Sequence, residues 1–492
     1  MEESIFGSRI FIMFLIVFTT WFKINAQEWQ TMGNIENIVD NYRILELYPD
    51  TSEDKLFIGG HFQSIGNTLT SNITSFDGHQ YDYISLEINE CSNLGCRGVS
   101  SIIRYKDNII ASSIRSANYE NDPQIIGIGR WDGGAWYPMD GGIATDYDEF
   151  YEYYDPGLIF DFCISNDILY VAGYFKYVDS LPEAGLAAWD GTQWTIFNVP
   201  APPLGDAILA TSVSKYKGDI YLGGNFDVTL EGDTINDLIK YDGNTWQKVG
   251  DGLIDGWTNM HDLEVFQDKL IVSGYFTKTD GNPGNSIMSW DGEHWNDMAG
   301  GICTPYGAID DLFVYGDKLY VAGYFDCIGG IEAHNVAVWD GAKWCSIGNS
   351  TFDKAVHAIA VWHDTVYIGG SFLKINDQPS RLFARYVGNH STDVCSDPVN
   401  LTEEPSRNAA RLLIIPNPVK DQLTISVSMG NLLPTVWRVF NTSGQEMTVL
   451  INPISLSTAQ QQVLEVQNLP TGVYFLQGLG QEGIATGKFV KM

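Results

Sequence analysis

Short apolar runs recur along the chain, and each is too short for a typical helix. Nearly every position within a run is apolar, which predicts a strand covered on both faces. A seventh run, IIASSI at 109–114, lacks the Gly-x-Phe ending of the others but falls in the expected gap. The six runs that end in Gly-x-Phe are LFIGGHF (56–62), LYVAGYF (169–175), IYLGGNF (220–226), LIVSGYF (270–276), LYVAGYF (319–325) and VYIGGSF (366–372).

An aromatic-Asp-Gly phrase follows each run. Its six intact copies are 55, 58, 52, 49 and 49 residues apart, and a degenerate copy, YVG at 386–388, comes 47 residues later. Asp-Gly favours tight hairpin turns, so we interpret these aspartates as turn residues rather than ligand groups. The aromatic residue four positions later is interpreted as packing between units rather than as a sugar platform. The aspartates are Asp77, Asp132, Asp190, Asp242, Asp291 and Asp340.

One repeat unit therefore holds four strands. In the sixth unit we expect them at Ile309–Val314, Leu319–Phe325, Val336–Trp339 and Trp344–Ile347. A four-stranded meander of about 50 residues, repeated, is typical of a β-propeller blade. The pattern predicts an all-β fold, with a seven-bladed β-propeller over residues 27–388.

The seventh unit is predicted to lack its outer strand, because no tryptophan follows the degenerate copy at 386–388. The missing strand is expected at the other end of the repeats. EWQTMG, Glu28–Gly33, resembles TWQKVG at 245–250. We expect this N-terminal strand to close the last blade and remove the open edge of a linear array.

The units resemble the kelch-like propeller repeat, in which a glycine-ending second strand precedes an aromatic-Asp third strand and a tryptophan. The resemblance covers roughly residues 28–390 and implies the fold rather than a function. The units depart from that repeat in their Asp-Gly hairpins and in often having one glycine where two are usual. They do not resemble the WD40 type, because no Gly-His marker recurs.

Residues 1–26 have the pattern of an export signal. Arg9 precedes an apolar run from Ile10 to Phe22, and Ala26 offers a small residue for cleavage. The run is short for a spanning helix, which needs about 20 residues, and an uncleaved membrane anchor is the alternative. No later stretch is long and apolar enough to span, so we expect the mature chain outside the cytoplasm without a membrane-spanning segment.

The chain is strongly acidic. Among its 492 residues, 61 acidic side chains oppose 28 basic ones, for a formal charge of −33. Nucleic-acid binding requires Lys and Arg to neutralise phosphates, and anionic lipid attracts basic segments. The balance therefore argues against both kinds of partner.

The seven cysteines can form disulfides in an exported protein. Cys91 and Cys96 bracket a short loop, and Cys303 and Cys327 belong to one blade, so both pairs are candidate disulfides. An odd number leaves at least one thiol unpaired. No CxxC pair exists, which argues against a structural zinc site.

The C-terminal part differs from the repeats. Residues 389–411 are polar and aperiodic and are interpreted as a linker. Residues 412–492 contain short strands separated by Gly, Pro, Asn and Ser, which predicts a small Ig-like β-sandwich.

Four stretches of this part, IIPNPVKDQLTI, WRVFNTSGQEM, NLPTGVYFLQ and GKFVKM, resemble the type A sorting domain of the type IX secretion system. The resemblance implies a Bacteroidetes-type source, export by the type IX machinery as a partner, and a secreted or surface-attached product. A plain accessory sandwich is the alternative. The residues in the motif positions are Pro416, Asn417, Pro418, Gly444, Leu469, Gly472, Tyr474 and Lys488.

The longest insertion, DGGIATDYDEFYEYYDPG at 140–157, is the candidate ligand site. Carboxylates beside tyrosines could hold Ca²⁺, or could stack on a sugar or a basic peptide; a solvated loop is the alternative. No other cofactor and no metal site is predicted, and the histidines, His357 and His363 among them, show no ligand spacing. The candidate ligand-binding residues are Asp146, Tyr147, Asp148, Glu149, Tyr151, Tyr153 and Tyr154.

Two functions remain open. The first is a secreted or surface-displayed binding module for a glycan or protein. The second is an extracellular polysaccharide hydrolase or lyase with loop carboxylates as acid and base. Carboxylates with a raised pKa around the central axis of the propeller would favour the enzyme. A rim of exposed aromatic side chains would favour the binding module.

Overall fold

The computed structural model divides the chain into two units, Met1–Cys395 and Ser396–Met492. Each unit is considered by itself. The structure describes residues 28–33, 42–70, 72–84, 98–115, 125–148, 153–183, 185–200, 208–254, 258–304, 306–387, 411–415, 419–428, 436–441, 446–447, 449–453, 461–480 and 483–491.

In the described residues of the first unit, seven four-stranded antiparallel sheets repeat one strand order and are numbered here along the chain; an eighth four-stranded sheet is given below. Sheet 1 is β2 (Arg43–Asp50), β3 (Lys55–His61), β6 (Ile73–Phe76) and β7 (Tyr81–Tyr83). Sheet 2 is β8 (Ile102–Tyr105), β9 (Asn108–Arg115), β10 (Ile126–Trp131) and β11 (Trp136–Pro138). Sheet 3 is β14 (Leu158–Ser165), β15 (Ile168–Tyr174), β18 (Leu186–Trp189) and β19 (Trp194–Ile196).

The next three sheets repeat this order. Sheet 4 is β20 (Leu209–Tyr216), β21 (Asp219–Leu230), β22 (Asp233–Tyr241) and β23 (Trp246–Lys248). Sheet 5 is β24 (Asn259–Phe266), β25 (Lys269–Tyr275), β26 (Ile287–Trp290) and β27 (Trp295–Asp297). Sheet 6 is β28 (Ala308–Tyr315), β29 (Lys318–Tyr324), β32 (Val336–Trp339) and β33 (Trp344–Ser346).

Sheet 7 takes its fourth strand from the start of the chain. Its strands are β34 (Val356–Trp362), β35 (Thr365–Gly370), β38 (Phe383–Tyr386) and β1 (Trp29–Thr31). Trp29 pairs with Tyr386 and is fully buried, and Glu28 accepts hydrogen bonds from Asn349 N (2.7 Å) and Ser350 Oγ (3.2 Å). The N-terminal strand therefore joins the last sheet of this unit.

Small elements lie between the second and third strands. They are the pairs β4 (Ser64–Ile65) and β5 (Thr68–Leu69), β30 (Cys327–Ile328) and β31 (Ile331–Glu332), and β36 (Lys374–Ile375) and β37 (Gln378–Pro379), and a 3-10 turn at Lys278–Asp280. Another sheet contains β12 (Ile143–Asp148), β13 (Tyr153–Pro156), β16 (Tyr177–Val178) and β17 (Leu181–Pro182).

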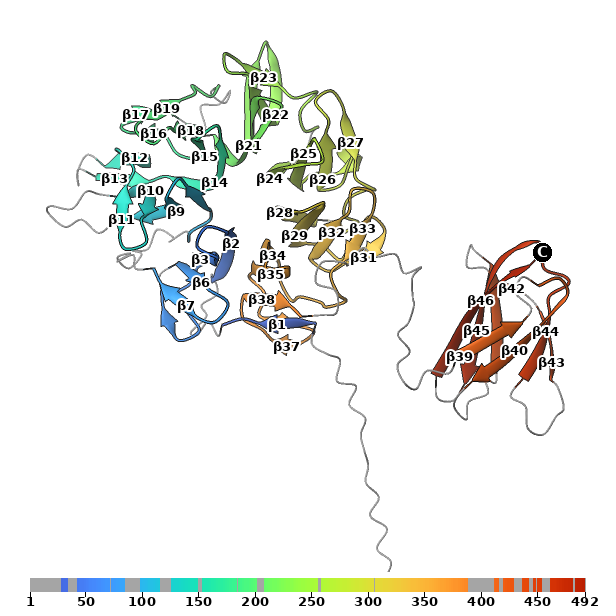
Figure 1. Cartoon of the computed structure of the whole chain (residues 1–492). Helices are drawn as coiled ribbons and strands as arrows, with labels where there is room; N and C mark the ends of the chain where they lie inside the picture. Colours follow the sequence, from blue (N-terminus) through green and yellow to red (C-terminus); the bar gives the residue numbers. More distant parts are fainter. Residues whose placement is uncertain are drawn as a thin grey trace, which may run out of the picture. The chain divides into compact units, whose positions relative to one another are not determined.

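The seven sheets follow one another around a common centre, and the labelled first strands β2, β14, β24, β28 and β34 are the innermost of their sheets (Figure 1). Consecutive inner strands are in contact, and β2 of sheet 1 lies against β34 and β35 of sheet 7. The second strands lie behind the inner ones and are buried along most of their length, as in Leu319–Ala322. This burial on both faces explains their continuous apolar sequence.

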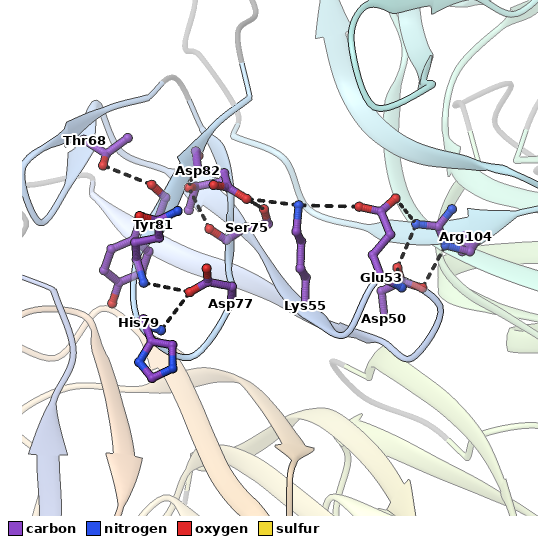
Figure 2. Close-up of polar contacts among 12 residues, drawn as sticks. Asp50, Glu53, Lys55, Thr68, Ser75, Asp77, His79, Tyr81, Asp82 and Arg104 are labelled. Atoms are coloured by element: carbon purple, nitrogen blue, oxygen red, sulfur yellow. Dashed lines mark hydrogen bonds and ion pairs between the residues drawn. The ribbon is translucent and has the colours of Figure 1, made fainter.

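The Asp-Gly turns have the predicted structure. Asp77 Oδ1 accepts hydrogen bonds from His79 N and Gln80 N, each at 2.8 Å (Figure 2). The other five turn aspartates accept the same two backbone hydrogen bonds from residues two and three positions later. The interpretation of the phrase as a turn is confirmed.

The tryptophans after these turns join neighbouring sheets, as predicted. Trp194 Nε1 donates to Asp140 O (2.9 Å), just beyond the outer strand of sheet 2. Trp246 Nε1 donates to Phe197 O (3.1 Å) and Trp344 Nε1 to Met298 O (2.9 Å), at the equivalent places after sheets 3 and 5. These three tryptophans thus satisfy their ring N–H on the preceding sheet, whereas the buried Nε1 atoms of Trp136 and Trp295 have no hydrogen-bond partner in the described residues.

An ion-pair network joins sheets 1 and 2. Arg104 binds both carboxylate oxygens of the buried Asp50, at 2.8 and 2.7 Å, and reaches Glu53 at 2.6 Å (Figure 2). Lys55 pairs with Asp82 at 3.0 Å and with Glu53 at 3.6 Å. The bidentate geometry fixes the side chain of Arg104 between the two sheets.

The second unit has two four-stranded sheets. One contains β39 (Arg411–Ile415), β40 (Gln422–Ser428), β44 (Gln461–Glu465) and β43 (Leu450–Pro453). The other contains β42 (Glu446–Met447), β41 (Val436–Asn441), β45 (Gly472–Gly480) and β46 (Gly483–Lys491). Their common core includes Leu423, Leu464, Trp437, Val439, Leu476 and Phe489.

Candidate functional site

Six of the seven inner strands carry a β-bulge at the same place. The register against the second strand shifts there by one residue, and the extra residue is left unpaired. Bulges of this kind re-aim a side chain. We call the extra residues the bulge residues; in chain order they are Leu45, Phe160, Thr211, His261, Asp310 and His357.

Three consecutive bulge residues form one hydrogen-bonded cluster. His261 Nδ1 lies 2.9 Å from Asp310 Oδ1, and His357 Nδ1 lies 2.8 Å from Asp310 Oδ2. On the other side of its ring, His357 Nε2 lies 2.8 Å from Ser371 Oγ, just beyond the end of β35. The side chains of His261, Asp310 and His357 are 25%, 20% and 23% exposed, so solvent reaches this cluster.

The charge of Asp310 determines the direction of these hydrogen bonds. Burial alone would raise its pKa, but the hydrogen bonds from His261 and His357 outweigh this effect and lower the pKa to about 2. An ionised carboxylate only accepts, so both Nδ1 atoms carry the hydrogen. In neutral His357, Nε2 is then an acceptor, and the Ser371 hydroxyl donates to it.

In four of the six sheets, the residue after the bulge links its sheet to the next one. We call the residues at this position the belt residues: Glu46, Asp161, Ser212, Asp262, Asp311 and Ala358. Four of them accept a backbone N–H from the following sheet: Asp161 from Val213 (2.7 Å), Ser212 from Leu263 (3.0 Å), Asp262 from Leu312 (2.9 Å) and Asp311 from Ile359 (2.6 Å).

The belt carboxylates have raised pKa values. Burial raises the pKa of Glu46, Asp161, Asp262 and Asp311, and the charges of other belt carboxylates raise those of Glu46, Asp161 and Asp311 further. Burial likewise raises the pKa of the neighbouring Glu264 to about 8. Because three of these carboxylates bind the backbone of the next sheet, their raised pKa values have a structural cause and do not by themselves indicate catalysis.

Two exposed tyrosines stand beside the cluster on sheet 6. Tyr306 is 85% and Tyr324 is 54% exposed. Tyr324 pairs with Ala308, two residues before Asp310, and Tyr306 lies two residues before the start of β28. Cys303 and Cys327 flank these tyrosines in sequence and form a disulfide, with their Cα atoms 5.5 Å apart. The disulfide therefore restrains the chain next to both tyrosines.

The other cysteines differ in state. Cys345 is disulfide-bonded, and Cys163 on β14 is a free thiol. Burial raises the pKa of Cys163 to about 12, so this thiol stays protonated at neutral pH. Cys91 and Cys96 lie outside the described residues, and their pairing stays a prediction.

The predicted ligand segment contains a hairpin. Tyr147 pairs with Tyr154 and Asp148 with Tyr153, and β12 continues the pairing to β16. Glu149 and Tyr151 lie outside the described residues, as do the side chains of Asp146, Tyr147, Asp148, Tyr153 and Tyr154. Their role in binding a ligand or Ca²⁺ stays a prediction.

A pocket of about 230 Å³ lies between sheets 1 and 2, lined in part by Glu53, Lys55, Asp82 and Trp131. Its charged groups pair with one another (Figure 2). Within the ranges that the structure describes, no three His, Cys, Asp or Glu side chains are arranged to hold a metal ion.

Sequence reasoning missed the cluster because it compared histidines by their distance along the chain. His261 and Asp310 are 49 residues apart, and Asp310 and His357 are 47 apart. These distances equal one repeat, so the three residues occupy the same position in consecutive units. Aligning the units on their inner strands would have placed them side by side.

The comparisons with known proteins concern the second unit. Residues 413–492 match the family model of the secretion system C-terminal sorting domain. No curated protein matches the chain. This domain marks proteins that the type IX secretion system exports to the cell surface or the extracellular space, so the protein is secreted or attached to the outer-membrane surface. In the part of the chain that the structure describes, no helix has the length and apolarity needed to cross a bilayer.

Several motif residues of the sorting domain lie in its packed core. Leu469 and Tyr474 are buried, and Tyr474 Oη donates to Pro470 O at 2.8 Å. Gly472 begins β45, and Lys488 lies on β46. Pro416, Asn417, Pro418 and Gly444 lie outside the described residues.

Proposed function

We propose that the seven sheets of the first unit are the blades of a closed seven-bladed β-propeller over residues 27–388. The pairing of β1 with β38 and the contact of β2 with β34 support this architecture, because both join the ends of the array. On this proposal, 389–411 is a linker and 412–492 an Ig-like sandwich that serves as the sorting domain.

The exported propeller acts as a binding module for an extracellular glycan or protein. The observation that carries this proposal is the pair of exposed tyrosines, Tyr306 and Tyr324, beside the Cys303–Cys327 disulfide. Tyrosine offers a large apolar face and a polar tip, and it loses little conformational entropy on binding. A disulfide next to the loops reduces the ordering cost further.

The hairpin of β12 and β13 extends the same proposal. The inner strands begin, and the second strands end, at the same end of the sheets. The loops between second and third strands therefore emerge at that end, and β12 pairs with β16 in one of these loops. The carboxylates and tyrosines of 146–154 would then add polar contacts, and Ca²⁺ if it binds there, to the aromatic surface of sheet 6.

Binding to a glycan array and to a panel of extracellular proteins tests the proposal, with the full chain as the probe. The double variant Tyr306→Ala, Tyr324→Ala should weaken binding to a captured ligand at least about tenfold, since each buried aromatic contributes 1 kcal/mol or more at an interface. Tyr83→Ala, at another exposed tyrosine, is the matched control. Equal affinity of the double variant and the natural chain would refute this surface as the binding site.

The alternative remains an extracellular polysaccharide hydrolase or lyase with loop carboxylates as acid and base. In the described residues, three of the four belt carboxylates bind the backbone of the next sheet, so they give this alternative no specific support. Reducing-end and unsaturated-sugar assays on the ligands that the array identifies would separate it from binding alone.

A further inference from the structure

Ser371, His357 and Asp310 form a continuous relay. Ser371 Oγ lies 2.8 Å from His357 Nε2, and His357 Nδ1 lies 2.8 Å from Asp310 Oδ2. The order hydroxyl, imidazole, carboxylate, with each ring nitrogen bonded to one partner, is the geometry of an activated serine. Such a relay is recognised by geometry and role, whatever the order of its members along the chain.

The directions of the hydrogen bonds suit this role. Asp310 accepts through both oxygens, so it holds His357 in the tautomer whose Nε2 has a free lone pair. That lone pair faces the Ser371 hydroxyl and can take its proton. His261 is the second donor to Asp310, so it acts on Asp310 and not on Ser371 directly.

Ser371 is also unusual within the repeat. The residue between the glycine and the phenylalanine of the second-strand motif is His61, Tyr174, Asn225, Tyr275 or Tyr324 in the other five copies. Among the six copies of the motif, only that of the seventh sheet has a serine at this position. The hydroxyl of Ser371 lies beside His357, which is the one bulge residue of sheets 5–7 that contacts a hydroxyl. Ser371 and His357 belong to the same sheet, and Asp310 comes from the neighbouring one, so the relay needs both sheets in place.

We propose that Ser371 is a nucleophile toward carboxylic esters, with His357 as general base and Asp310 as the group that orients it. Ser371 Oγ would bond to the acyl carbon while its proton moves to His357 Nε2. The ester C–O bond breaks, and the alcohol leaves with that proton. Water then attacks the acyl-serine, passes its proton through His357 back to Ser371, and releases the acid.

The experiment treats the folded full chain with an alkyl fluorophosphonate and maps adducts by peptide mass spectrometry. We expect a phosphonyl group on Ser371, with fluoride released, and hydrolysis of p-nitrophenyl acetate above background. His357→Gln should reduce the labelling rate at least about 100-fold, and Asp310→Asn should reduce it strongly because it favours the wrong tautomer. Ser371→Ala should abolish the adduct and the hydrolysis.

Two controls keep the outcome decisive. His363→Gln changes an exposed histidine of the same sheet that pairs with Asp54 instead, and it should leave labelling unchanged. Heat-unfolded chain should show no adduct at Ser371, since the relay exists only in the folded unit. The proposal is overturned if folded natural chain carries no adduct at Ser371, or if His357→Gln with an unchanged melting curve labels as fast. Neither result depends on which ligand the tyrosines of sheet 6 bind.

Discussion

At the scale of single residues, aspartate has three different functions in this protein. The turn aspartates accept two backbone N–H groups at the surface, and these hydrogen bonds lower the pKa, as in Asp77. The belt aspartates accept a backbone N–H from the next sheet, and burial raises their pKa. Asp310 is held ionised by two histidines. Side-chain chemistry is identical in all three cases, so the surroundings decide the charge.

Asp262 offers a test of the belt at this scale. Asp262→Ala leaves Leu312 N without its acceptor and should lower the free energy of unfolding by about 1–3 kcal/mol, the cost of an unpaired buried polar group. Asp262→Asn keeps an oxygen acceptor and carries no charge to desolvate, so its loss should be smaller. Urea unfolding of both variants measures the difference; an alanine variant as stable as the natural chain would contradict the proposed linking role.

At the scale of elements, β1 is the strand that the local sequence of sheet 7 lacks. Trp29 is fully buried in a cluster with Tyr386, Ile347 and Phe372. The carboxylate of Glu28 also binds the loop after β33 of sheet 6. One short strand thus covers the edge of β38 and joins sheets 6 and 7.

A chain that begins at residue 34 should therefore be much less stable than one that begins at residue 27. Removing β1 exposes the edge of β38 and the core around Trp29; Trp29→Ala alone should cost about 3–5 kcal/mol, as for other buried large-to-small changes. Thermal unfolding of the two chains makes the comparison. Equal melting temperatures would show that β1 is an unessential terminus and would remove the support it gives to ring closure.

At the scale of the whole molecule, buried carboxylates make the stability of this acidic chain depend on pH. The formal charge is −33, and Asp237 and Glu264 have pKa values raised by burial to about 7 and about 8. Their unfolded values are near 4. Between these pH values the folded state binds more protons than the unfolded chain, so the free energy of unfolding falls as pH rises.

The melting temperature of the first unit should therefore be higher at pH 5 than at pH 8, by about 3 °C or more. Tryptophan fluorescence reports this unit, since only Trp437 of the 14 tryptophans lies beyond residue 395. The double variant Asp237→Asn, Glu264→Gln should reduce the difference at constant ionic strength. A melting temperature that rises from pH 5 to pH 8 would contradict the raised pKa values.

Much of the architecture follows from local sequence. The predicted strands of the sixth unit, 309–314, 319–325, 336–339 and 344–347, lie within a residue or two of β28, β29, β32 and β33. Apolar runs and Asp-Gly turns act over a few residues, so one unit reveals its strands without knowledge of its neighbours. The sorting motif is likewise a local pattern, and its family match required no structure.

The candidate site is a property of the tertiary structure. His261, Asp310, His357 and Ser371 come from three sheets, and β-bulges, which no residue type specifies, turn three of them toward one another. The raised pKa values of the belt depend on burial, which arises only when neighbouring sheets meet. Short-range patterning was enough to predict the strands, the turns and the number of repeats, because residues close together along the chain set these features. Packing between repeats determines which side chains pair with an opposite charge, which can exchange a proton and which lie on the same surface.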